Sequence, residues 1–169
     1  MIVAWIFVVL PAIFTGIDVK SKTISRTTKN KRNLFVINFG LRIGALFQFL
    51  FLIYLIGKFN LSYLSLTVVL YFSTIVATLV VSFTPIYKNT KLHQRSAYYY
   101  FSTIPIFLIL FGLSIKDTYN PLSKISILIA ALYLIGMLLI NIKIKKENAL
   151  SEIWAFLMLS IWTIIITFI

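Results

Sequence analysis

The chain has 169 residues, of which 60% are apolar and 12% are charged, with a mean hydropathy of +0.99 and a formal net charge of +12. Soluble domains carry about 25% charged residues, so this composition excludes a soluble globular domain and indicates that lipid surrounds the protein. The chain has no cysteine, which excludes disulfides, thiolate metal sites and a catalytic cysteine.

Six apolar segments are each long enough to cross about 30 Å of hydrocarbon as a helix. The first has no basic residue before it and no small-residue cleavage site, so we interpret it as a span and not as a signal peptide. The sequence therefore predicts an all-α, polytopic integral membrane protein, with residues 1–169 forming one domain of six transmembrane helices. The predicted spans are residues 1–17, 34–56, 61–83, 96–115, 125–142 and 152–169.

The distribution of Lys and Arg predicts the orientation of these spans. Basic residues are concentrated in the first, third and fifth connections: Lys20, Lys22, Arg26, Lys29, Lys31 and Arg32, then Lys88, Lys91 and Arg95, then Lys143, Lys145 and Lys146. The second and fourth connections hold only Lys58, Lys116 and Lys124. Short basic connections stay in the cytoplasm, so we expect both termini outside a plasma (inner) membrane. The same placement explains the net charge without a nucleic-acid partner.

The second predicted span contains a pattern typical of helix packing. Gly40 and Gly44 form a G-x-x-x-G motif, and Gln48 continues the same face one turn later. Small residues let two membrane helices approach closely, and a glutamine amide can form a hydrogen bond across the contact. We therefore predict that Gly40, Gly44 and Gln48 are helix-packing residues.

The opposite face of this span carries Asn38 and Arg42, one turn apart. Arg42 lies about 12 Å inside the span at about 1.5 Å per residue, where a charge costs roughly 2.5–3.5 kcal/mol on insertion scales. Two interpretations remain open. Either Arg42 extends back to the cytoplasmic headgroups, or it faces the bundle and binds an anion.

Polar side chains in the later spans also predict protein contacts. Thr67, Tyr71, Thr74, Thr78 and Ser82 share one face of the third span, so this face should be directed towards protein and not lipid. Pro105 in the fourth span leaves one backbone carbonyl without its helical partner, which requires a protein group or water nearby. We interpret the remaining conspicuous aromatic residues as interfacial: Trp5, Trp154 and Tyr98–Tyr100.

The predicted orientation brings several polar residues to the cytoplasmic leaflet. Arg42, Asn38 and His93 are the candidate ligand-binding residues, because a guanidinium suits phosphate or carboxylate oxygens. A cavity there would hold a lipid headgroup or an anionic solute. Alternatively, Asp18 or Glu152 pairs with Arg42 and the cluster is purely structural.

The sequence offers little for catalysis. Its four acidic residues, Asp18, Asp117, Glu147 and Glu152, all lie outside the interior of the predicted spans. No metal-binding, nucleophile or phosphate-binding motif occurs. We therefore expect neither a metal nor another cofactor, and the sequence favours a non-catalytic protein.

Two short signatures resemble a known family. Ile24-Ser25 precedes Asn33-Leu34-Phe35 at the second span, and Pro85 precedes His93, Ala97 and Phe101 at the fourth. Together they resemble the damage-regulated autophagy modulators and Sfk-type membrane proteins. This resemblance implies a six-helix membrane fold, a link to lipid organisation, no established catalytic residue, and a structural or functional polar role for His93.

Three functional hypotheses follow. The first is a non-catalytic membrane protein that binds lipid, with anionic lipid among the candidates, or a membrane partner through a cytoplasm-side polar pocket. The second is a solute-binding subunit like the six-span components of vitamin transporters. The third is an accessory subunit or homo-oligomer that packs through Gly40 and Gly44.

Overall fold

The computed structural model describes residues 31–84, 89–144 and 149–169, and all of its regular structure there is helical. The helices are α4 (Lys31–Phe59), α5 (Leu66–Phe83), α6 (Thr90–Ser114), α7 (Asn120–Ile144) and α8 (Ala149–Phe168). All five are long and apolar enough to cross a membrane. The all-α class and the integral membrane character are therefore confirmed. The first predicted span, residues 1–17, lies outside the described residues.

The five helices overlap predicted spans two to six, but the start of α5 differs from the prediction. The segment after α4 turns at Asn60, which has a φ of 49°, and α5 begins only after Ser65. The Ser65 hydroxyl accepts a hydrogen bond from the Val68 backbone N–H, which satisfies one of the unpaired donors of the first turn. Hydropathy alone placed this start at Leu61, because it does not detect a capping residue.

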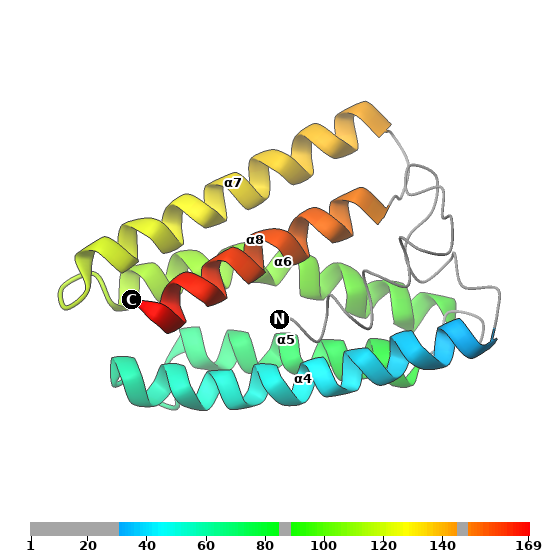
Figure 1. The fold of residues 1–169 in the computed structure, drawn as a ribbon, viewed down its shortest axis with the longest axis horizontal. Coiled ribbons are helices and arrows are strands. Elements are labelled where there is room, and N and C mark those ends of the chain that lie inside the picture. Colours follow the sequence, from blue (N-terminus) through cyan, green and yellow to red (C-terminus); the bar gives the residue numbers. More distant parts are fainter. Residues whose placement is uncertain (1–30, 85–88, 145–148) are drawn as a thin grey trace.

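Successive helices run antiparallel, and α6 lies in the middle of the bundle (Figure 1). Through hydrogen bonds and ring contacts α6 touches each of the other four described helices, in the pairs Gln48–Tyr100, Tyr71–Phe107, Phe101–Tyr133 and Phe107–Trp162. In contrast, the described contacts between α4 and α8 involve the second half of each helix, as in the ring contact of Phe51 with Trp162 and the hydrogen bond from Lys58 Nζ to the Ile166 carbonyl at 2.9 Å. The two helices therefore meet in the half of the bundle where α4 ends.

Trp162 is the centre of the core. Its side chain is fully buried, and its ring makes edge-to-face contacts with Phe51 of α4 and with Phe107 and Phe111 of α6 at centroid distances of 5.8, 5.4 and 5.2 Å. Its indole N–H donates to Ser126 Oγ of α7 at 2.9 Å. Such ring pairs contribute about 0.5–1.5 kcal/mol each, so one side chain links α4, α6, α7 and α8.

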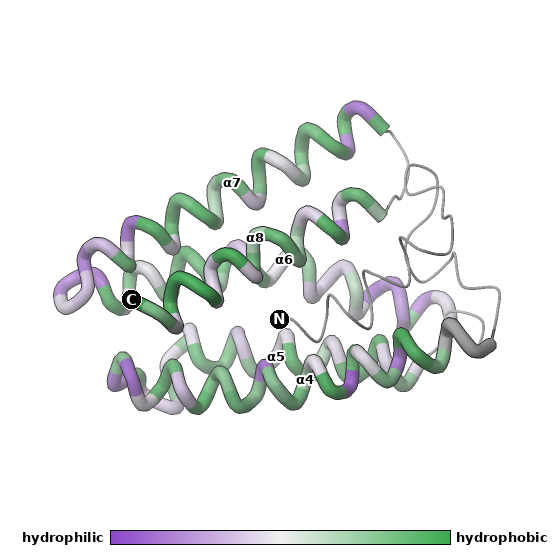
Figure 2. Tube along the Cα trace, in the orientation of Figure 1, coloured by the Kyte–Doolittle hydropathy of each residue, from purple (hydrophilic) through white to green (hydrophobic). Residues whose placement is uncertain are grey.

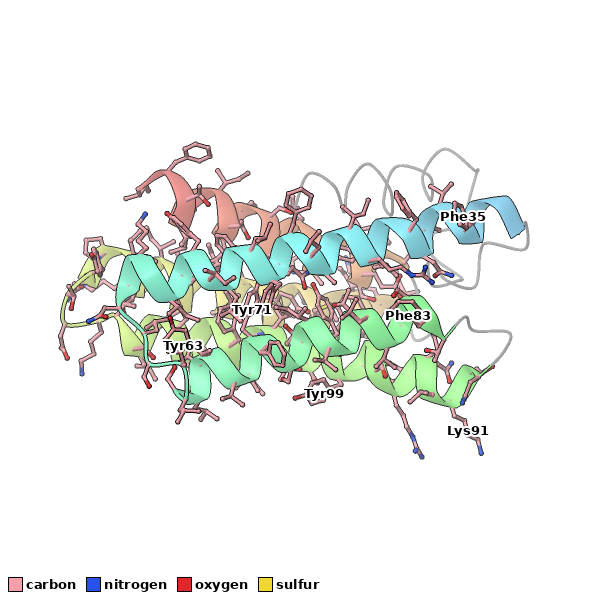
Figure 3. The ribbon with its side chains drawn as sticks, turned by 90° about the horizontal axis from the view of Figure 1, so that it is seen from below. Phe35, Tyr63, Tyr71, Phe83, Lys91 and Tyr99 are labelled. Atoms are coloured by element: carbon pink, nitrogen blue, oxygen red, sulfur yellow. The ribbon has the colours of Figure 1, made fainter. Side chains whose placement is uncertain are left out.

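The hydroxyl-bearing face of α5 is directed towards protein, as predicted: Thr67, Tyr71, Thr74, Thr78 and Ser82 are all buried. Figure 3 shows Tyr71 between the helices. Thr74, Thr78 and Ser82 donate to backbone carbonyls of the preceding turn at 2.7, 2.9 and 2.8 Å. These hydroxyls are satisfied within their own helix, so they do not indicate a polar path across the membrane.

Pro105 lies inside α6 and is buried. Because proline has no backbone N–H, the carbonyl of Phe101 four residues earlier loses its helical partner. Tyr133 of α7 donates its hydroxyl to this same carbonyl at 2.9 Å. The prediction that a protein group satisfies the carbonyl freed by Pro105 is confirmed.

Two glycines let helices approach closely. A Cβ atom at Gly136 of α7 would overlap the indole of Trp154 on α8, whose N–H donates to the carbonyls of Leu132 and Tyr133 at 3.3 Å each. A Cβ atom at Gly112 of α6 would lie 2.9 Å from the Ser123 carbonyl of α7. Glycines therefore bring α6, α7 and α8 together. The sequence pattern predicted this role for Gly40 and Gly44 of α4.

Most residues along the five described helices are apolar, and hydrophilic residues lie mostly near the two ends of the bundle (Figure 2). The end where α4 begins carries Lys91, Arg95 and Lys143 on exposed positions, and Figure 3 shows Lys91 beyond the core of the bundle. The opposite end carries Lys58, Lys116 and Lys124. Exposed leucine, isoleucine and phenylalanine side chains between the ends suit contact with lipid.

Candidate functional site

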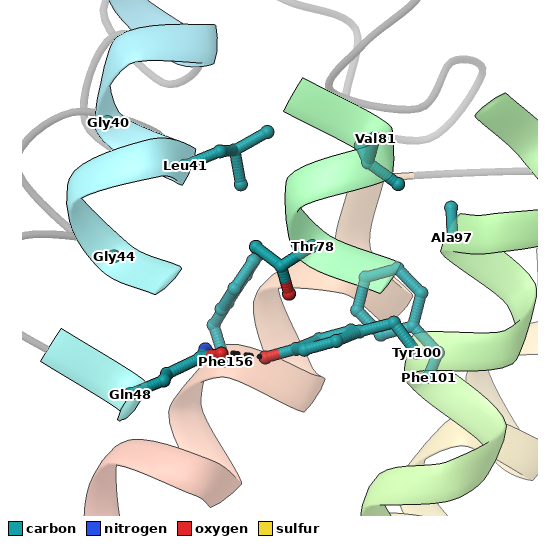
Figure 4. A pocket seen from close by; sticks show the side chains of 10 residues that line it. All are labelled: Gly40, Leu41, Gly44, Gln48, Thr78, Val81, Ala97, Tyr100, Phe101 and Phe156. Carbon is teal, nitrogen blue, oxygen red and sulfur yellow. Dashed lines mark hydrogen bonds between the residues drawn. The ribbon is translucent and has the colours of Figure 1, made fainter. Parts of the chain in front are cut away.

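An open cavity lies in the half of the bundle where α4 begins (Figure 4). Its walls come from four helices: Gly40, Leu41, Gly44 and Gln48 of α4, Thr78 and Val81 of α5, Ala97, Tyr100 and Phe101 of α6, and Phe156 of α8. The space between these walls, including the open mouth, is about 480 Å³. The lining is mainly apolar, its polar side chains are Gln48, Thr78 and Tyr100, and none of its residues is charged.

Gln48 and Tyr100 face each other across this cavity. Gln48 Nε2 donates to the Tyr100 hydroxyl at 3.3 Å, so α4 and α6 are linked by a hydrogen bond. Gln48 is only 9% exposed, and its Oε1 is buried without a hydrogen-bond partner among the described residues. Exchanging the amide oxygen and nitrogen would pair Oε1 with Tyr100 and leave Nε2 unpaired, so either orientation leaves one polar atom unsatisfied.

The unpaired atom is deep in the predicted membrane. Gln48 lies 13 residues after Phe35, where the apolar span of α4 begins, which is about 20 Å along the helix. A buried polar group without a partner costs roughly 1–3 kcal/mol, and the surrounding hydrocarbon offers no substitute. Nearly all buried polar groups in proteins have a partner, so this amide is the best indication of a binding site.

Tyr100 is placed differently from its two neighbours. Tyr98 and Tyr99 are exposed, whereas Tyr100 is buried with 7% of its surface accessible. The interpretation of all three as interfacial residues is therefore wrong for Tyr100. Its place could have been found from helical spacing, because Tyr100, Ile104 and Phe107 follow one another at intervals of four and three residues and are all buried.

The two glycines of α4 border the cavity. Gly40 is buried and Gly44 is half-buried, and both contribute to its wall. A Cβ atom built on Gly44 meets no heavy atom within 4 Å. Within the described part of the chain, Gly44 therefore leaves open space and does not pack against a neighbouring helix. Of the three residues predicted to pack, Gln48 forms a hydrogen bond with another described helix.

Arg42 lies outside the cavity, on the surface between α4 and α5. Its Nη2 donates to the Ser82 carbonyl at 3.5 Å, and its guanidinium carbon is 4.1 Å from the centre of the Phe83 ring. Ser82 belongs to the last turn of α5, where unpaired carbonyls favour a cation. Arg42 is an exposed residue although its hydrogen bond to Ser82 is partly buried.

His93 lies at the same end of α5. It is 5% exposed, and its Nδ1 donates to the Thr84 carbonyl at 2.7 Å. The structure thus brings Arg42 and His93 to carbonyls two residues apart. Asn38 is half-buried one turn before Arg42, and none of these three predicted ligand-binding residues lines the cavity.

The predicted acidic partners of Arg42 are placed as follows. Asp18 lies outside the described residues. Glu152 is half-buried in the first turn of α8, whereas the hydrogen bond of Arg42 is made to α5. Among the described residues, no group of three or more His, Asp or Glu side chains could hold a metal ion.

Comparison of the chain with known protein families, with curated proteins and with solved structures finds no match. The resemblance to the damage-regulated autophagy modulators and Sfk-type proteins therefore stays a prediction. The functional evidence is the geometry of the cavity and of the residues around it.

Proposed function

We propose that this protein is a non-catalytic integral membrane protein of six spans that binds a membrane lipid in the cavity between α4, α5, α6 and α8. The observation that carries the proposal is the cavity itself. Its walls are largely apolar, as those of small-molecule sites usually are, and it is open to the surface of the bundle. Such a cavity within a bundle surrounded by lipid is accessible to an acyl chain.

The proposal includes an orientation. The cavity lies in the half of the bundle that carries Lys91, Arg95 and Lys143, which the distribution of basic residues assigns to the cytoplasm. The bound lipid would then come from the cytoplasmic leaflet of a plasma (inner) membrane. Both termini would lie on the outer side.

Arg42 supports a further contact with an anionic headgroup, alongside Asn38 and His93 as predicted. Its guanidinium is exposed and already oriented by the Ser82 carbonyl and the Phe83 ring. A guanidinium can donate two parallel hydrogen bonds to a phosphate.

Arg42→Lys should therefore weaken the retention of anionic phospholipid, and Arg42→Gln should remove it, as measured by lipid analysis of the purified protein. Unchanged anionic lipid in Arg42→Gln would show that this residue only holds the end of α5.

Native mass spectrometry of the purified protein tests the cavity. In Gly44→Leu a side chain would extend into the open space, so we expect a several-fold lower fraction of protein with a retained lipid. Gly57→Leu is the matched control, because Gly57 lies on the same helix, also has open space at its Cβ and does not line the cavity.

Equal lipid retention in Gly44→Leu, Gly57→Leu and the wild type would overturn the assignment of the cavity. A retained water-soluble compound would favour the solute-binding subunit instead. A stable protein partner, or a second copy of the chain, would favour the accessory subunit.

A further inference from the structure

We infer that the cavity selects an uncharged lipid with a hydroxyl group and binds that hydroxyl between Gln48 and Tyr100. This inference rests on the proposed lipid binding and specifies the chemistry of the ligand. It concerns the part of the lipid that reaches the two polar side chains in the middle of α4 and α6. The proposed anionic contact at Arg42 is a separate site.

The acceptor in this site is the Gln48 amide. Its Oε1 is buried, borders the cavity and has no hydrogen-bond partner among the described residues. The surrounding walls are mainly apolar and none of the described residues supplies the missing donor, so a molecule that enters the cavity can supply it. A ligand that supplies an O–H removes the penalty of the unpaired oxygen.

The donor is the Tyr100 hydroxyl. A phenol has one O–H to donate, and here its oxygen already accepts from Gln48 Nε2. None of the described residues accepts its proton, so the proton can be donated to a ligand oxygen close to Gln48. The two side chains together offer one acceptor and one donor. A ligand hydroxyl, which both donates and accepts, complements the pair. The ligand hydroxyl also fits the alternative orientation of the Gln48 amide, because its oxygen can accept a hydrogen bond from Nε2.

The charge of the cavity excludes an anionic group at this position. None of its lining residues carries a charge, and the nearest cationic side chain along α4, Arg42, contacts Ser82 and Phe83 on the surface. A phosphate beside Gln48 would be buried without a counter-charge, which costs far more than two hydrogen bonds return. The geometry therefore points to a neutral lipid alcohol such as a diacylglycerol.

Three photoreactive probes with identical acyl chains test this inference: a 1,2-diacylglycerol, its 3-O-methyl ether and the corresponding phosphatidic acid. The full chain is reconstituted in nanodiscs, labelled with each probe, and the labelled peptides are identified by mass spectrometry. The diacylglycerol should label the peptides that line the cavity about tenfold more than either analogue, because one lost hydrogen bond changes affinity by roughly that factor. The ether accepts but does not donate, and the phosphate is charged.

Variants then assign the selectivity to the two side chains. In the double variant Gln48→Leu with Tyr100→Phe both polar groups are replaced by apolar ones, so the unliganded protein should be as stable as the wild type or more stable. The diacylglycerol and its methyl ether should label this double variant equally. Thr67→Val with Ser114→Ala is the matched control, since it removes a 2.9 Å hydrogen bond between α5 and α6 away from the cavity. It should keep the preference for the free hydroxyl.

The outcomes separate this inference from the function on which it rests. Equal labelling of the wild-type cavity by all three probes would overturn hydroxyl selection and leave lipid binding intact. Preferred labelling by phosphatidic acid would also overturn it. If no probe labels the cavity of the wild type above the level of Gly44→Leu, then both the inference and the proposed function are wrong.

Discussion

The hydroxyl of Tyr133 replaces a hydrogen bond that the backbone of α6 cannot make. Pro105 leaves the Phe101 carbonyl unpaired, and Tyr133 reaches it from α7 at 2.9 Å. In lipid, no water is present to do the same, so a proline within a span requires a side chain of this kind. Gln48 Oε1, in contrast, is buried and has no hydrogen-bond partner among the described residues.

A double-mutant cycle tests this pairing. Tyr133→Phe should reduce stability in detergent by about 0.5–1.5 kcal/mol, because the Phe101 carbonyl loses its donor. In a Pro105→Ala background the new N–H of residue 105 can pair with that carbonyl, so the same Tyr133→Phe change should cost clearly less. Thermal unfolding of the four proteins measures the coupling. An equal loss in both backgrounds would mean that Tyr133 stabilises the bundle through its ring alone.

At the residue scale, the sequence predicted the need for a partner but not its identity. Helical periodicity was enough to predict that the hydroxyl-bearing face of α5 is buried. It could not predict that Tyr133 pairs with Phe101 or Gln48 with Tyr100, because these contacts depend on the relative rotation of two helices. The prediction of a ligand-binding site started from the charge of Arg42. It therefore did not include the uncharged pair Gln48 and Tyr100, which lines the cavity.

Among the described helices, close approach occurs at α6, α7 and α8 through Gly112 and Gly136, whereas a Cβ atom at Gly44 of α4 meets no heavy atom within 4 Å. The motif predicted helix packing because two glycines one turn apart form a flat surface. Whether that surface meets a helix depends on what lies opposite, which the sequence of one helix does not specify. Here the opposite side of Gly44 is the cavity.

Two alanine substitutions separate these roles. Gly136→Ala should lower stability by about 1–3 kcal/mol, because the added methyl overlaps the Trp154 indole and displaces its hydrogen bonds to α7. Gly44→Ala should leave stability unchanged or raise it by up to about 1 kcal/mol, since alanine favours helix and its methyl meets open space. Thermal unfolding in the same detergent compares them. The reverse order would show that α4 packs tightly through Gly44.

For the whole molecule, hydropathy predicted the helical membrane fold well, because lipid requires long uninterrupted helices. The neighbouring order of α4 to α8 also follows from short connections between antiparallel helices. The central place of α6 did not follow from the sequence, since the span of α6 is less apolar than that of α4. It depends on the aromatic contacts of Phe107 and Phe111 with Trp162.

The predicted orientation is directly testable, because the chain has no cysteine of its own. A single cysteine at Asn89, between α5 and α6, should resist a membrane-impermeant thiol reagent in intact cells. A cysteine at Asn60 or Asn120, at the opposite end of the bundle, should react. Labelling at Asn89 with protection at the other two positions would reverse the orientation and move the cavity to the outer leaflet.

The contacts between α4 and α8 also bear on how the protein is made. Lys58 and Ile166 are 108 residues apart, so their hydrogen bond forms only after all the helices between them have been synthesised. The pairs from α4 to α7 can assemble as each helix leaves the ribosome, but Phe156 completes the wall of the cavity only when α8 arrives. A nascent chain that stops before α8 has an incomplete cavity and a lysine without its carbonyl, two features by which membrane quality control can recognise an unfinished protein.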